Sequence, residues 1–437
     1  MLLPVDLREW VGPDDLVHFV IEAVEGMNLP CLKVNRRGTG SEQFPPKMML
    51  ELLIYCYANG IFSSRRIERS TYRDIAVRFL TGNTHPDHDT ICTFRRENLD
   101  AVGEAFLQVL RLARELGLLK VGTVSVDGTK MLANASKHNS LRYDRAGELV
   151  EELQQEIQGL LKQAEQADQT EVNDGQSLPE EIGRREKLKA KLEKARRTLE
   201  ARAKARAEDE QADYERLKAQ REERPGRSKG KHPKPPEQTP APDQQINLTD
   251  EDSSLMRKNK RSEYLQAYNA QAAVDAEGSQ LIVGCHVSTC AADGRERTGC
   301  VGDIAAELGS VQNVLADSGY INEEQATELE TAGITPYVAV GRADRRLHDF
   351  RPRLAEPVGP KPEPSEWKRR MKERLESEVG RRLYRLRKQT VEPVFGVIKE
   401  AMGLRRFLLR GLTKVEGEWD LVCLAYNIRR LFALRTA

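Results

Sequence analysis

Three acidic residues stand at positions where carboxylates can take part in metal chemistry. Asp127 and Asp317 each follow a short segment typical of a strand, and Glu392 lies in a segment with helical periodicity. Hard cations such as Mg²⁺ prefer oxygen ligands, and two such ions about 3.5 to 4 Å apart activate an attacking oxygen and stabilise a leaving one in phosphoryl transfer. A strand-end Asp alone usually forms a turn and a helical Glu is usually solvated. The chemistry therefore depends on elements that bring all three together.

Composition limits the classes of protein to consider. The chain has 437 residues with 69 basic and 68 acidic side chains, so it is not a uniformly basic nucleic-acid binder. Residues 366–388 nevertheless hold ten Lys or Arg against four Glu, which leaves a local anionic partner open. Seven cysteines without a CxxC pair favour reduced thiols in the cytoplasm. We expect no export signal and no membrane helix.

The first 120 residues have the periodicity of helices. Apolar side chains recur at three- and four-residue spacing over residues 14–25, 46–58, 64–80 and 89–116. Turn-forming residues at 82–87 separate the last two segments. We expect an all-helical domain over residues 1–120.

The pattern then changes from strand to long helices. Residues 123–129 alternate β-branched and small polar side chains, which predicts a strand ending at Asp127. Residues 141–222 are rich in Glu, Lys, Arg, Gln and Ala with a break at 175–179, so we expect two long helices folded back as a helical, coiled-coil-like hairpin. Six prolines between residues 225 and 242 predict a flexible linker over 223–258.

The rest of the chain predicts an α/β core. We expect strands at 267–275, 280–288, 314–316 and 336–340, helices near 301–308 and 323–332, and helices from 366 to the end. With the strand before Asp127 counted first, the order is β-β-β-α-β-α-β.

The acidic residues belong to motifs that resemble a known family. These motifs are Val126-Asp127-Gly128-Thr129, Ala316-Asp317-Ser318-Gly319-Tyr320 and the segment from Glu392 to Lys399. Together with residues 266–275 they are similar to the DDE transposases of bacterial insertion sequences. Residues 44–50 and 88–96 resemble the helical N-terminal domain that accompanies that catalytic core.

The resemblance implies a fold and a reaction. The fold class is α/β: a ribonuclease H-like catalytic core over 121–140 and 259–437, the helical N-terminal domain, and a helical-hairpin insertion over 141–222 after the first core strand. Asp127, Asp317 and Glu392 are then the catalytic residues and the ligands of two Mg²⁺ ions, for which Mn²⁺ can substitute. The implied reaction is cleavage of DNA at the element's ends, followed by attack of the freed 3′-hydroxyl on target DNA.

Two features depart from the family pattern. The family's third motif often carries a Tyr seven positions before the Glu and an Arg four before it, whereas this chain has Arg385 and Lys388 there and Tyr384 one place early. The family's insertion commonly follows the second Asp, whereas here it follows the first strand. The function of the hairpin is therefore not transferable, and dimerisation, DNA holding or a plain internal helix pair stay open.

Basic side chains are the expected DNA contacts. They are Lys399, Lys388 and Arg387 near the third motif and Arg65, Arg66, Arg95 and Arg96 in the N-terminal domain. Lys399 follows Glu392 by two helical turns, which predicts that both lie on one helix face. The helices around the turn at 82–87 predict a helix-turn-helix that reads the terminal repeats.

The expected partners are double-stranded DNA at the element's ends and at the target, and further copies of the chain in a homodimer or higher oligomer, with no membrane. The expected location is the nucleoid of a bacterial cytoplasm. The main alternative is a transposase-derived DNA-binding protein without catalysis. A coiled-coil interaction protein and a nuclease of the same fold are weaker alternatives, because they leave the three acidic motifs or the N-terminal match unexplained.

Overall fold

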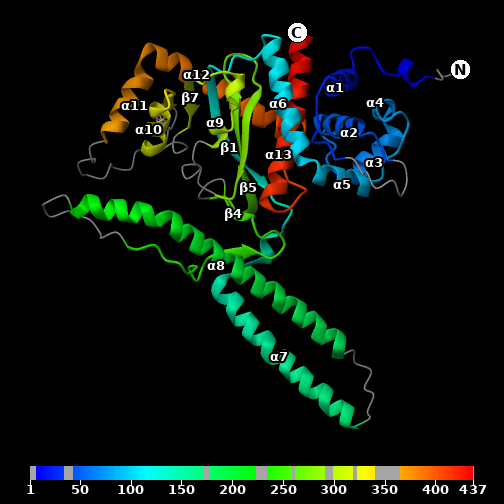
Figure 1. The fold of residues 1–437 in the computed structure, drawn as a ribbon, viewed down its shortest axis with the longest axis vertical. Coiled ribbons are helices and arrows are strands. Elements are labelled where there is room, and N and C mark those ends of the chain that lie inside the picture. Colours follow the sequence, from blue (N-terminus) through cyan, green and yellow to red (C-terminus); the bar gives the residue numbers. More distant parts are fainter. Residues whose placement is uncertain are drawn as a thin grey trace, which may run out of the picture. The chain divides into compact units, whose positions relative to one another are not determined.

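The computed structural model describes residues 6–33, 43–170, 178–222, 234–257, 261–290, 299–317, 322–339 and 365–436 (Figure 1). These residues fall into two compact units. The first comprises Met1–Asn134, Met256–Glu263 and Ala267–Ala437, and the second Ala135–Leu255 and Tyr264–Gln266. No helix among the described residues is both long and apolar enough to cross a membrane.

A mixed sheet lies at the centre of the first unit. Its strands are β1 (Thr123–Leu132), β5 (Leu265–Asp275), β6 (Ile282–Ser288), β7 (Asn313–Ala316) and β8 (Thr335–Val338). Their order is β6-β5-β1-β7-β8, and the short β4 (Ser254–Met256) also adjoins β5. The pairs β1–β5 and β5–β6 are antiparallel, whereas β1–β7 and β7–β8 are parallel. The five strands expected from the sequence are present in that order along the chain, and the protein is of mixed α/β class.

The N-terminal helices follow the predicted segments with two additional breaks. They are α1 (Leu16–Glu25), α2 (Pro46–Ala58), α3 (Ser64–Arg73), α4 (Ile75–Leu80), α5 (His88–Glu97) and α6 (Leu99–Glu115). The segment expected as one helix over 64–80 breaks at Asp74, whose backbone is extended and whose side chain accepts the N–H of Val77. Such an N-cap satisfies one of the free amides at a new helix start. The segment expected as one helix over 89–116 breaks at Asn98, which lies between the end of α5 and the start of α6.

The C-terminal helices cover the sheet. They are α11 (Glu366–Glu376), α12 (Glu378–Gly396), a π-helical turn (Val397–Ala401) and α13 (Leu412–Arg435). Helix α12 packs on β1 and β7, and α13 packs against β6, α2 and α6. Because α13 lies between the sheet and the N-terminal helices, it is apolar around most of its surface and buried. It therefore joins the N-terminal helices to the sheet.

Polar side chains of α13 fix it to the strands. Trp419 is fully buried and donates its indole N–H to the carbonyl oxygen of Gln271 on β5, at 2.9 Å. Asn427 accepts from the backbone N–H of Ile282 at 2.9 Å and donates to its carbonyl at 2.8 Å. The backbone N–H and carbonyl groups of Ile282 are thereby satisfied by a side chain.

Two expectations about local structure are wrong. Strand β1 does not end at Asp127, because Gly128 and Thr129 continue the antiparallel pairing with β5 as far as Leu132. The helix expected near 301–308 is reduced to α9 (Gly299–Gly302) and a 3-10 turn at Ala306–Leu308. Glycines at both ends of α9 disfavour a longer helix. Helix α10 (Glu323–Thr331) forms close to its predicted bounds.

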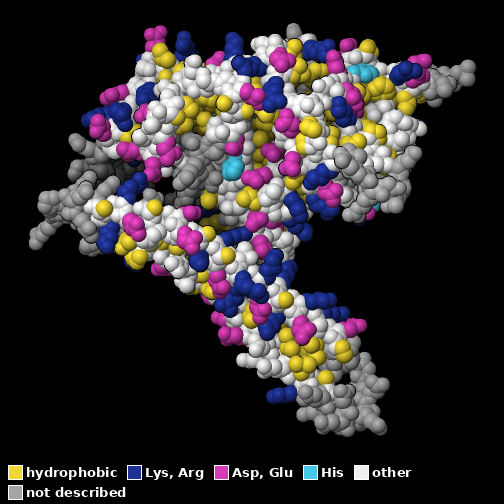
Figure 2. Space-filling model, in the orientation of Figure 1, with side chains coloured by type: hydrophobic (Ala, Val, Ile, Leu, Met, Phe, Trp, Pro, Cys, Tyr) yellow, Lys and Arg dark blue, Asp and Glu magenta, His cyan; other side chains and the backbone are white. Residues whose placement is uncertain are grey.

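The second unit contains two long helices that lie side by side, α7 (Tyr143–Thr170) and α8 (Leu178–Glu222) (Figure 1). Val150 and Leu153 of α7 and Leu192 of α8 form a small apolar cluster between them. Acidic and basic side chains are interspersed over the pair (Figure 2), and many of them are joined in ion pairs, such as Arg185 with Glu156 at 2.7 Å. The charge of these helices is therefore largely compensated within the unit.

The expected linker is only partly described. Residues 223–233 and 258 lie outside the described residues. The part between them is not a plain linker, because it includes β3 (Gln245–Asn247), which pairs with β2 (Ser140–Arg142), and also β4. Ile246 of β3 is buried, which a purely polar connection does not require.

Candidate active site

The register of the central strands brings the two aspartates side by side. Strand β1 pairs with β7 through Ser125 opposite Leu315. Asp127 and Asp317 each lie two residues further along their strand direction, and Asp317 is just beyond the last residue of β7. The two carboxylates therefore lie at the same end of the β1–β7 pair, where the parallel pairing stops. Residues 318–320 of the second motif lie outside the described residues.

Helix α12 supplies the third carboxylate from one face of the sheet. Glu392 lies near its C-terminal end, and apolar neighbours such as Val391 and Val394 are buried beneath it. The side chain of Glu392 is 52% exposed, that of Asp317 57% and that of Asp127 24%. The three carboxylates are thus accessible from solvent while their backbones are held by the core.

Arg387 of α12 joins the three carboxylates. Its Nη2 atom lies 3.2 Å from Oδ2 of Asp317 and 3.7 Å from Oδ2 of Asp127, and its Nη1 atom lies 3.1 Å from Oε1 of Glu392. The side chain of Arg387 is only 7% exposed. The structure therefore brings all three predicted acidic residues around a single cation. The sequence predicted that Arg387 contacts DNA. In this structure its partners are the three carboxylates.

Tyr384 lies one helical turn before Arg387 and holds the end of β7. Its hydroxyl donates to the carbonyl oxygen of Ala316, the residue before Asp317, at 3.3 Å. Burial raises the pKa of Tyr384; Arg387 opposes this increase, and the three carboxylates add to it. The hydroxyl therefore remains a hydrogen-bond donor at neutral pH.

Lys399 approaches the same strand from the π-helical turn. Its Nζ atom donates to the hydroxyl of Thr129 at 2.5 Å and lies 3.4 Å from the carbonyl oxygen of Lys130. Thr129 is two residues from Asp127 and hence on the same face of β1. The prediction that Lys399 and Glu392 share one helix face assumed an unbroken α-helix, whereas the π turn changes the angular spacing before Lys399. Sequence reasoning did not single out Thr129 as the partner of Lys399.

An all-oxygen donor set of three carboxylates fits a hard divalent cation. As the side chains stand, no group of three His, Cys, Asp or Glu residues in the described parts of the chain is arranged to hold a metal ion. The guanidinium of Arg387 is the group that contacts all three carboxylates instead. The residues present therefore fit a divalent ion in chemistry, and an ion that used these oxygens would take the place of the guanidinium.

The predicted DNA contacts divide into buried and exposed residues. Arg95 is 4% exposed and donates to the hydroxyl of Tyr57 at 2.8 Å and to the carbonyl oxygen of Phe62 at 3.0 Å. Arg95 was predicted to contact DNA; in this structure its guanidinium is buried and holds α5 to α2. Arg65, Arg66, Arg96 and Lys388 are exposed.

The exposed arginines continue along α3. They are Arg65, Arg66, Arg69 and Arg73, and none of them forms an ion pair within the described residues. The one acidic residue of this helix, Glu68, is turned toward α5, where it lies 2.9 Å from Nδ1 of His88. A hollow of about 290 Å³ on this face is lined by Ile61, Arg66, Arg69, Ser70, Arg73 and Asp74. The face carries uncompensated positive charge.

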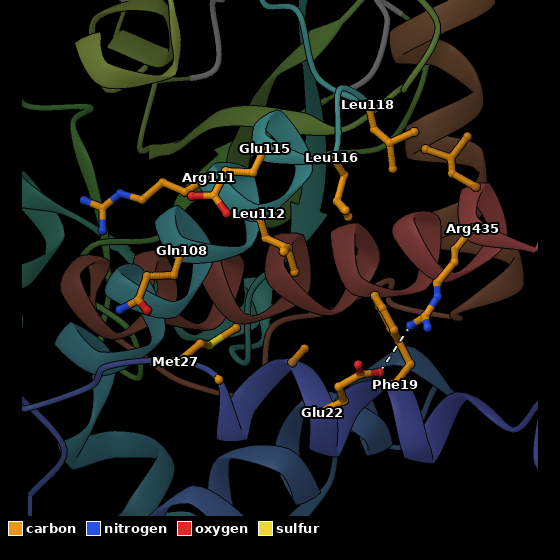
Figure 3. A pocket seen from close by; sticks show the side chains of 13 residues that line it. Phe19, Glu22, Met27, Gln108, Arg111, Leu112, Glu115, Leu116, Leu118 and Arg435 are labelled. Carbon is orange, nitrogen blue, oxygen red and sulfur yellow. Dashed lines mark hydrogen bonds and ion pairs between the residues drawn. The ribbon is translucent and has the colours of Figure 1, made fainter.

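A separate pocket of about 740 Å³ lies between α1, α6 and α13 (Figure 3). Phe19, Met27 and Leu112 line it, and Glu22 and Arg435 form an ion pair of 3.2 Å at its side. None of the predicted acidic or DNA-contacting residues lines this pocket, so the candidate chemistry lies elsewhere.

Comparison with known families identifies two segments. Residues 357–432 match the family described as Transposase DDE domain, and residues 5–97 match the family described as Transposase domain (DUF772). No curated protein and no solved structure matches the chain. The two matched domains define a transposase. One of them is the DDE domain and contains Arg387, Glu392 and Lys399, so the two matches support an insertion-sequence DDE transposase.

Proposed function

We propose that this transposase binds the terminal inverted repeats of its insertion sequence and catalyses metal-dependent DNA cleavage and strand transfer. The proposed catalytic residues and metal ligands are Asp127, Asp317 and Glu392, on a core of ribonuclease H-like type. The observation that carries the proposal is the convergence of these three carboxylates, distant in sequence, on one buried guanidinium. Like charges repel unless a cation compensates them, so three carboxylates at one place form a site suited to a cation.

The chemistry follows from the donor set. Two Mg²⁺ ions, or Mn²⁺ in their place, would supply activation of the attacking oxygen and stabilisation of the leaving oxygen. The protein positions the ligands: β1 and β7 hold the aspartates, Tyr384 holds the end of β7, and α12 holds Glu392. Lys399, kept beside β1 by Thr129, is placed to bind a phosphate of the DNA strand.

The proposed partner is double-stranded DNA, both at the ends of the element and at the target site. Arg65, Arg66 and Arg96 of the N-terminal helices and Lys388 of α12 are exposed and can bind phosphates. The helix pair expected around the turn at 82–87 is α4 and α5, and α5 packs against α3. We therefore propose that α3 and α5 together form the DNA-facing part of this domain. Assembly into a dimer or higher oligomer on DNA and location at the nucleoid belong to the same proposal.

The test is cleavage of a labelled duplex that carries the gene's own flanking DNA, with Mg²⁺ or Mn²⁺. Asp127→Asn, Asp317→Asn and Glu392→Gln are each expected to abolish cleavage while duplex binding remains. Glu400→Gln is the matched control, because Glu400 is an exposed acid on the same segment that pairs only with Arg405 among described residues, at 2.6 Å. Cleavage that survives in the three variants contradicts the assignment. Binding without cleavage by the wild type supports the catalytically silent alternative.

A further inference from the structure

The guanidinium of Arg387 occupies the centre of the candidate site. It is almost excluded from solvent, and its two terminal nitrogens are shared among three carboxylates within 3.1 to 3.7 Å. A planar guanidinium presents several N–H groups in a fixed fork, so one Arg can pair with more than one carboxylate. Its Nε atom is buried without a hydrogen-bond partner, so its interactions in the described structure are those of the terminal nitrogens with the acids.

The three carboxylates need a positive charge between them. Asp127, Asp317 and Glu392 together carry three negative charges at one end of the sheet. Removing the cation from a half-buried cluster leaves the remaining charges uncompensated, which is strongly unfavourable. In the absence of divalent ions, Arg387 is the only cationic side chain with an ion pair to all three in the described residues.

The same position is unsuitable for two cations at once. A divalent ion bound by these oxygens would lie within a few ångströms of the guanidinium, where like charges repel. In agreement with this, the carboxylates as they stand are arranged around Arg387 and not in a group that can hold a metal. Metal binding and the three ion pairs of Arg387 are therefore mutually exclusive arrangements of one set of ligands.

We propose that Arg387 is the internal counter-cation of the metal-free site: it holds the three carboxylates together and is displaced when divalent ions bind. The inference rests on the proposed function, because it takes the three carboxylates as metal ligands. Arg387 is then a positioning residue that competes with the metal. Its expected contact with DNA applies to the metal-bound state, in which the guanidinium has lost its carboxylate partners.

The test measures Mn²⁺ binding to the full-length protein without DNA, by electron paramagnetic resonance or calorimetry. Two unit charges about 4 Å apart repel each other even in water, so Arg387→Gln is expected to tighten Mn²⁺ binding about five-fold or more. Arg385→Gln is the matched control, because Arg385 is an exposed Arg on the same helix without an ion pair in the described residues. It is expected to leave the Mn²⁺ Kd unchanged within about two-fold, as exposed charges are screened.

A purely structural role for Arg387 predicts the opposite result. If Arg387 only supports the fold, Arg387→Gln binds Mn²⁺ as weakly as the wild type or more weakly, and the proposal is overturned. Arg387→Lys covers the case in which Arg387→Gln does not fold. A single ammonium pairs with fewer carboxylates than the fork of Arg, so this variant is expected to bind Mn²⁺ more tightly than the wild type. Equal or weaker binding overturns the proposal in the same way.

The failure of the inference is distinguishable from that of the proposed function. The proposed metal ligands fail if Mn²⁺ binding by the wild type is absent or is retained when Asp127, Asp317 and Glu392 are all replaced by their amides. The inference alone fails if those amides abolish Mn²⁺ binding while Arg387→Gln does not strengthen it.

Discussion

Glu51 provides a quantitative test of how the N-terminal helices are packed. It lies on α2, is 4% exposed, and its Oε1 atom has no hydrogen-bond partner in the described structure. Burial raises the pKa of Glu51 from 4.5 to about 7; the charge of Glu25 adds to the increase and Lys47 opposes it. The perturbation we consider is Glu51→Gln, which keeps the shape of the side chain and removes the charge.

The sign of the effect follows from the direction of the pKa change. Because the pKa of Glu51 is higher in the folded state, folding favours the protonated carboxyl. The associated stability is fully present below about pH 4.5 and is lost as the pH rises through about 7. The full difference corresponds to about 3 kcal/mol, and solvent screening reduces the expected loss to about 1 to 3 kcal/mol. Glu51→Gln does not have this loss, so it gains stability relative to the wild type at high pH.

The assay is thermal unfolding at pH 5 and pH 8. Glu51→Gln is expected to raise Tm at pH 8 by about 2 °C or more, and by much less at pH 5. Glu115→Gln is the control, because Glu115 is an exposed carboxylate at the end of α6 without an ion pair among the described residues. An equal Tm change at both pH values, or a lower Tm for Glu51→Gln at pH 8, refutes the argument that an unpaired buried charge destabilises α2.

Three further predictions concern DNA contact, positioning and the core. The double variant Arg66→Ala/Arg69→Ala is expected to reduce the salt dependence of DNA binding, d log K/d log[salt], by about 2, measured by fluorescence anisotropy. Thr129→Val is expected to slow DNA cleavage about ten-fold without loss of duplex binding, since it removes the hydroxyl that holds Lys399; an unchanged single-turnover rate counts against this role. Trp419→Ala is expected to lower the free energy of unfolding by about 3 to 5 kcal/mol in urea titrations, because it empties a fully buried site.

The sequence predicted which strands form better than it predicted where each strand ends. Period-two segments became β5, β6 and β7 with bounds close to expectation, because alternation reflects burial of one face. The end of β1 was misplaced, since Gly128 reads as a turn signal although tertiary pairing with β5 carries the strand through it. A single sequence contains no direct information on such pairing, so a local turn signal outweighed it.

Side-chain partners were the least predictable part of the site. The burial of Arg95 depends on Tyr57, which lies 38 positions away, and no local pattern distinguishes it from the exposed Arg96. The contact of Lys399 with Thr129 depends on a π turn, which the seven-residue spacing from Glu392 does not reveal. Three-dimensional packing decides which member of a basic pair faces the core.

The same argument settles which residues of α12 face the site. The motif of the resembling family predicted Arg385 and Lys388 at its Tyr and Arg positions. A shift of one residue rotates a side chain about 100° around a helix. A basic residue at the neighbouring position therefore cannot take the place of one that faces the site. Tyr384 and Arg387 are three residues apart, hence on one face, and both contact the ends of β1 or β7. The Tyr–Arg spacing of the family is therefore kept and the extra residue falls between Arg387 and Glu392, where the reach of a long Arg side chain still allows a 3.1 Å ion pair.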